Sequence, residues 1–236
     1  MAIGYGIIIL YAIVALKGSQ VKFVLREYGI MSMTINIFVN DIKNVSKADC
    51  EKFMQRFDII AQIHPESDLK SDTGFLPFRV EFPSHEFLKG KSFLSGFEIG
   101  TDAYDYEQVM QTIGEALSKK SGCFFGLFKK KTSENTVSEK YSLIPVNTGA
   151  EAINDLLKKC SHVVALDIST NDSFEPILAP AFASYLVESC DGVICYPHSD
   201  EYFYESNKQE IFDQINDFLD ELRPENLVSH PFEKWL

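Results

Sequence analysis

Hydrophobic and polar positions alternate along the first regular stretch of the chain, residues 34–40. Ile35, Ile37 and Val39 stand every second residue, which is the period of a half-buried β-strand. Similar patterns predict three more strands in the first half of the chain, at 59–63, 76–82 and 93–99. Apolar residues at helical spacing predict two amphipathic helices in the same half, over 47–57 with Ser46 as N-cap and over 106–117 with Asp105 as N-cap.

The second half of the chain begins with a predicted strand at 141–146 and a helix over 151–160. His162–Ile168 is a continuous, valine-rich apolar run, which is typical of a strand that is covered on both faces. A helix that starts at Asp172 or Ser173 follows, and then a short strand at 193–196. We therefore expect a right-handed βαβ unit with parallel strands in this part.

The last helix has the clearest two-sided pattern in the chain. Ser206 and Gln209 are spaced as a capping box, and apolar residues from Ile211 to Leu222 recur at helical spacing. Together the patterns predict an α+β fold, a mixed sheet with helices packed on it. The expected divisions are an apolar segment at 1–32, an α+β half at 33–118, a flexible insertion at 119–140 and an acidic α/β half at 141–236, which could form one domain with 33–118.

The apolar run over residues 2–16 can be interpreted in three ways. It is a membrane anchor, a buried hairpin or helix, or upstream sequence translated from an early start, since Met31 and Met33 stand directly before the first strand. A helix needs about 20 apolar residues to span a bilayer. Membrane contact through residues 2–16 is therefore possible but not favoured.

Charge is distributed unevenly along the chain. The formal net charge is −12, and residues 151–236 contain 17 acidic and 5 basic side chains, whereas residues 1–150 contain 17 of each. Such a field repels nucleic-acid phosphates and attracts a basic protein partner. Acidic surface also aids solubility, and this second explanation stays open.

Sequence motifs give little support for catalysis. The chain contains no G-x-x-x-x-G-K-[ST], G-x-G-x-x-G, H-E-x-x-H or G-x-S-x-G motif. A hydrolase-type enzyme that uses Cys195 and His198, with Asp200 beside them, is the alternative, although a cysteine in an apolar strand is usually packing. The spacing of His162, Asp167, His198 and Asp200 fixes no coordination geometry, so we expect no metal and no cofactor. The five cysteines include no C-x-x-C pair, which favours a reducing, cytoplasmic setting.

The stretch Asp200–Glu205 (DEYFYE) is the best candidate for a partner-binding surface. Two tyrosines and a phenylalanine stand among three carboxylates, and the next helix has several acids on its polar face. Rigid aromatic area combined with charge is favoured at protein interfaces. The alternative is that the aromatic residues face the core and the acids are simply solvated. The predicted partner-binding residues are Asp200, Glu201, Tyr202, Tyr204, Glu205, Asp213, Asp217 and Asp220.

The chain resembles the immunity proteins that protect bacteria from toxins. The resemblance rests on the α+β make-up, the acidic C-terminal half and the segment from Ile168 through DGVICYP to DEYFYE, about the last third of the chain as periodicity divides it. It implies a cytoplasmic antidote that covers the basic active site of a toxin, by acidic mimicry of a polyanion if the toxin is a nuclease. A membrane-peripheral structural protein, held by residues 2–16, is the remaining alternative.

Overall fold

A computed structural model of the protein describes residues 33–70, 73–111, 151–169, 172–197, 199 and 201–235. Residues 32–236 belong to one compact unit. The apolar segment at 1–32, the insertion predicted at 119–140, the strand predicted at 141–146, His198 and Asp200 lie outside the described residues. Within them, no helix is both long enough and apolar enough to cross a membrane.

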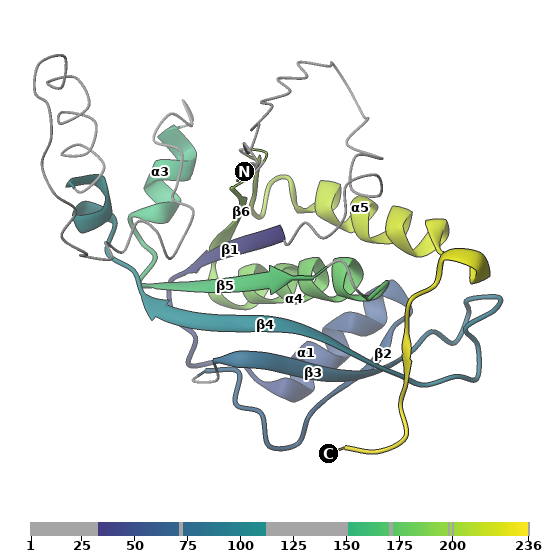
Figure 1. The fold of residues 1–236 in the computed structure, drawn as a ribbon. Helices are drawn as coiled ribbons and strands as arrows, with labels where there is room; N and C mark the ends of the chain where they lie inside the picture. Colours follow the sequence, from purple (N-terminus) through teal and green to yellow (C-terminus); the bar gives the residue numbers. More distant parts are fainter. Residues whose placement is uncertain are drawn as a thin grey trace, which may run out of the picture. The chain divides into compact units, whose positions relative to one another are not determined.

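The described elements follow the predicted order closely (Figure 1). The strands are β1 (Met33–Val39), β2 (Ile60–Ile63), β3 (Gly74–Glu81), β4 (Phe93–Ala103), β5 (His162–Ile168), β6 (Gly192–Tyr196), β7 (Glu201–Phe203) and β8 (His230–Pro231). The helices are α1 (Lys47–Met54), α3 (Glu151–Leu157), α4 (Glu175–Cys190) and α5 (Lys208–Glu221), with short 3-10 turns η1 (Gln55–Phe57) and η3 (Pro224–Asn226). Residues 106–111 are also helical. Ser46 caps α1 as predicted, because its side chain accepts a hydrogen bond from the Asp49 amide.

The described strands form one sheet in the order β2-β3-β4-β5-β1-β6-β7, and β8 pairs with β4. Every pairing in it is antiparallel. β1 lies between β5 and β6, and Asn36 stands opposite Ala165 of β5 on one side and Cys195 of β6 on the other. The two halves of the chain that the sequence separates therefore share one sheet.

The predicted C-terminal βαβ unit with parallel, paired strands is wrong. The strand, helix and strand exist as β5, α4 and β6, but β1 lies between β5 and β6 and pairs with each in the antiparallel sense. The strand β5 is also not covered on both faces, as its apolar run predicted. Val164, Leu166 and Ile168 are buried in the cluster on one face of the sheet, whereas on the other face only Val163 is buried and Asp167 is exposed.

Two hydrophobic clusters lie on opposite faces of the sheet. The larger one holds the inward residues of α1, α4 and α5 together with one face of the strands. Helix α4 runs along this face beside β1 and is almost wholly buried (Figure 1). It continues without a break through Pro180. The smaller cluster joins α3 and the 104–109 segment to the other face, around Phe38, Val163 and Val193.

Two carboxylates are buried where α4 begins. The Asp172 carboxylate accepts a 2.7 Å hydrogen bond from the Phe174 amide, and Glu175 accepts one of 2.9 Å from the Ser169 hydroxyl. The second oxygen of Glu175 has no hydrogen-bond partner among the described residues, although the residue is only 7% exposed. Burial raises the pKa of Glu175 to about 7, and the nearby Asp172 and Glu98 carboxylates add to the rise. Burial also raises the pKa of Asp172.

Candidate functional site

Helix α5 follows the edge strand β7, and a turn built by Asn207 connects them. The Asn207 side chain accepts a hydrogen bond from the Tyr204 amide and donates one to the Tyr202 carbonyl, at 2.8 and 2.9 Å. Asn207 is also the residue directly before the helix, so the capping box predicted from Ser206 and Gln209 does not form. An asparagine side chain that bonds nearby backbone groups is a common way to close such a turn.

One face of α5 anchors the helix on the larger cluster. Ile211 and Ile215 are buried, and the helix packs against α4. The Phe212 ring meets the rings of Phe53 and Phe57 edge-on, with centroids 6.1 and 5.1 Å apart. These contacts fix which residues of α5 face solvent.

The opposite face of α5 is acidic. Asp213, Asp217 and Asp220 are all exposed there, and Glu210 extends the same row towards the start of the helix. Neighbours in this row are three or four residues apart, so the carboxylates lie next to one another along the helix surface. The sequence prediction omitted Glu210, although its spacing to Asp213 and Asp217 could have identified it. We call these four residues the acidic row.

Most of the acidic row does not stabilise its own helix, since only Glu210, in the first turn, suits the helix dipole. Like charges three or four residues apart repel each other by about 0.2–0.5 kcal/mol per pair. Carboxylates near a helix C-terminus also oppose the helix dipole, and the last turn of α5 contains no basic residue to offset them. Gln209 donates a hydrogen bond to Asp213, and Arg223 bonds the Asp220 carbonyl oxygen. Neither contact places a cation on a carboxylate of the row.

Glu205 lies outside the row, in a network of salt bridges at the start of α5. Lys208 lies 2.8 Å from Glu205 and 3.2 Å from Glu188, and Arg56 lies 2.8 Å from the same Glu188. Burial alone would raise the pKa of Glu188. Hydrogen bonds from Arg56 and Lys208 outweigh burial and hold this pKa below its ordinary value. This network ties the start of α5 to α4 and to the 3-10 turn η1. Glu205 is therefore partly neutralised within the chain.

The structure separates the predicted tyrosines from the acidic row. Residues alternate between the two faces of a strand. Phe203 of β7 is buried in the larger cluster, whereas Tyr202 and Tyr204 pack against the smaller cluster on the other face. Glu201 is half-buried at the start of β7. The most exposed aromatic residue of α5 is Phe218, at 38%, and its spacing from Ile211 and Ile215 places it on the apolar stripe rather than on the acidic row.

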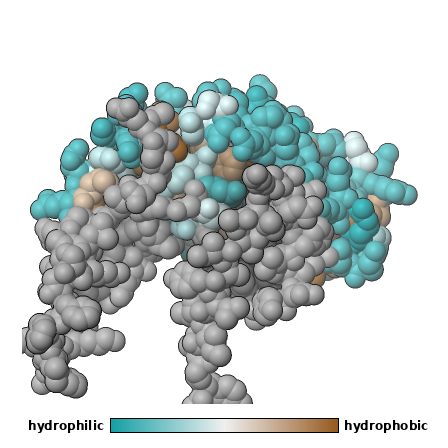
Figure 2. Space-filling view, turned by 90° about the horizontal axis from the view of Figure 1, so that it is seen from above, coloured by the Kyte–Doolittle hydropathy of each residue, from teal (hydrophilic) through white to brown (hydrophobic). Residues whose placement is uncertain are grey.

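The surface around α5 is mostly hydrophilic. Seen from the side on which α5 lies in Figure 1, the described residues show scattered hydrophobic spots among hydrophilic ones (Figure 2). A polar surface with isolated apolar side chains is common at non-obligate protein interfaces.

Catalysis and metal binding gain no support from the described residues. Cys195 is 0% exposed in the smaller cluster, where a substrate cannot reach its thiol. Asp167 accepts a 2.6 Å hydrogen bond from the Thr34 hydroxyl. No group of three or more His, Cys, Asp or Glu side chains in the described ranges could hold a metal ion.

Comparison of the chain with models of protein families, with curated proteins and with solved structures found no match.

Proposed function

We propose that the chain is a non-enzymatic binding protein that neutralises a basic protein partner through α5. The observation that carries this proposal is the acidic row, because four exposed carboxylates lie next to one another along one face of a helix and repel one another. A cationic surface brought against the row relieves this repulsion. Electrostatic complementarity of this kind steers association and selects the partner.

The kind of partner that suits this surface is a toxin of the sort that immunity proteins block. A row of carboxylates spaced along a helix can occupy a basic groove that normally holds a polyanion, so a nuclease domain is the preferred class of toxin. The resemblance noted in the sequence and the acidic C-terminal half support this choice. The same charge disfavours nucleic acid as a ligand.

Affinity capture with charge-reversed variants tests this function. We expect the wild-type chain to recover a basic protein from its native cells, and D213K/D217K to lose it. The matched control is E66K/E233K, which makes the same change in net charge at two exposed residues outside α5. Expression of the captured protein alone should arrest growth, and co-expression with the wild-type chain should restore it. Equal recovery by both double variants, or a captured protein without toxicity, would contradict the proposal.

A further inference from the structure

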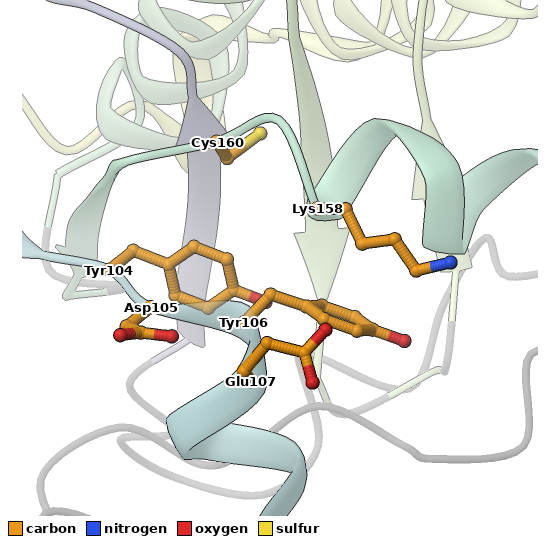
Figure 3. A pocket seen from close by; sticks show the side chains of 6 residues that line it. All are labelled: Tyr104, Asp105, Tyr106, Glu107, Lys158 and Cys160. Atoms are coloured by element: carbon orange, nitrogen blue, oxygen red, sulfur yellow. The ribbon is translucent and has the colours of Figure 1, made fainter.

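A pocket lies where β4 ends. It has a volume of about 330 Å³ and is lined by Tyr104, Asp105, Tyr106, Glu107, Lys158 and Cys160. Its walls come from the residues after β4, the start of the 106–111 helical turns and the residues after α3 (Figure 3). This volume falls in the lower part of the range for small-molecule sites.

The floor of the pocket is a buried tyrosine with an unused hydroxyl. Tyr104 is 8% exposed, and its hydroxyl has no hydrogen-bond partner among the described residues. The ring packs 4.8 Å from Phe38 and extends toward Tyr106 (Figure 3). A phenol that is neutral can both donate and accept a hydrogen bond. Burial raises the pKa of Tyr104, so the hydroxyl stays protonated.

The rim of the pocket favours positive charge. Lys158 already places its ammonium 5.9 Å from the centre of the Tyr106 ring, which is the geometry of a cation–π contact. A hydrogen bond from Lys158 to Asp155 raises the pKa of the lysine, and the fields of Tyr106 and Glu107 act in the same direction. The Glu107 carboxylate points to the same side as Tyr106 and Lys158 (Figure 3). The ammonium group of Lys158 therefore lies at the opening of the pocket.

The remaining lining groups restrict the ligand chemistry. Burial raises the pKa of the Cys160 thiol to about 12, so it is neutral and its Sγ donates to the Leu156 carbonyl oxygen at 3.4 Å. A neutral thiol is a poor metal ligand and a poor nucleophile. An anionic ligand would meet two carboxylates, of which Asp105 also caps the helical turns through the Gln108 amide. An organic cation fits these groups best.

We propose that this pocket binds the ammonium or guanidinium group of a small organic cation, between the Tyr106 ring and the Glu107 carboxylate, with the Tyr104 hydroxyl accepting a hydrogen bond. Lys158 occupies the rim in the absence of the ligand and swings outward when it binds. Tyr104 and Tyr106 belong to the smaller cluster, on the face of the sheet opposite the larger cluster that anchors α5. The proposal is thus independent of the function assigned to α5, and the ligand is a free molecule rather than a side chain of the protein partner.

Titration of the full-length chain with agmatine, followed by calorimetry and by NMR of the tyrosine side chains, tests this site. We expect saturable binding with a Kd on the order of 1 mM, and shifts of the Tyr104 and Tyr106 signals. Tyr106→Leu and Glu107→Gln should each weaken binding by roughly tenfold, and Lys158→Met should tighten it severalfold, because the competing ammonium is gone. Glu66→Gln, an exposed glutamate away from the pocket, is the matched control.

Three results would overturn this assignment. The first is no saturable binding of agmatine, and the second is binding that none of the pocket variants changes. The third is that the Tyr106→Leu variant no longer captures the basic protein partner. The cation that binds the pocket would then be a side chain of that partner rather than a free molecule. Circular dichroism of each variant shows whether the fold is kept, and Lys158→Met is informative by itself because it should increase affinity.

Discussion

Replacing Glu175 with glutamine is expected to stabilise the protein at about pH 8 by roughly 2–3 kcal/mol and to leave its stability near pH 5 almost unchanged. The pKa of Glu175 is about 7 in the folded protein, against an ordinary value of 4.5. The folded state therefore binds this proton more tightly than the unfolded chain does. The free energy of unfolding of the wild type then falls as the pH rises from 4.5 to about 7, and glutamine, which resembles the protonated acid, removes this fall.

Urea unfolding at several pH values measures this effect. The control is Glu66→Gln, the same substitution at an exposed position outside α5, which should change stability by less than about 0.5 kcal/mol. The Ser169 hydroxyl donates a hydrogen bond to the Glu175 carboxyl, and the Asp172 and Glu98 carboxylates raise its pKa further. A Glu175→Gln variant that gains no stability at the higher pH would contradict this prediction. It would show that the ionised Glu175 carboxylate does not destabilise the folded protein.

Truncating Phe182 to alanine is expected to cost about 3–5 kcal/mol of unfolding free energy, the largest loss for any single change considered. The side chain is 0% exposed in the middle of α4. Its ring lies 5.5 Å from that of Phe97 on β4 and 6.5 Å from that of Phe78 on β3, centre to centre. Deleting it opens a cavity between the helix and two strands of the sheet.

Phe218→Ala is the matched control for this cavity. It removes the same atoms from an aromatic residue that is 38% exposed, so the loss should stay near 1 kcal/mol. Chemical denaturation of both variants gives the comparison. Similar losses for the two would mean that α4 is not packed on the sheet as described.

Local periodicity predicted the helices and strands well. It did not predict how the strands pair with one another. The apolar stripe of α5 and the alternation in β1 each follow from which face is buried, and both elements are present. Pairing depends on neighbours that are far apart in the sequence. Nothing within His162–Tyr196 shows that β1, more than 100 residues earlier, pairs with both of its strands, as the register of Asn36 shows.

The candidate surface was predictable in part for a similar reason. The acids of α5 could be grouped because helical spacing fixes their face, and the same spacing indicates Glu210. Tyr202 and Tyr204 were grouped with them only because they are close in sequence, whereas the strand places Tyr202 on the other face of the sheet. Nothing in the sequence indicates that Glu175 is buried, since an acidic residue in the first turn of a helix is normally explained by the helix dipole.

The central claim, that the acidic row of α5 binds a basic protein, is tested most directly by the affinity for the captured partner as salt is varied. We expect the Kd of the wild-type complex to rise at least tenfold between about 50 and about 500 mM salt. At low salt, D213K/D217K should weaken binding by roughly a hundredfold and E66K/E233K by less than about threefold. Asp213 and Asp217 are both exposed, so their replacement is expected to leave the fold intact. Equal affinities for wild type and D213K/D217K, with no salt dependence, would contradict the claim.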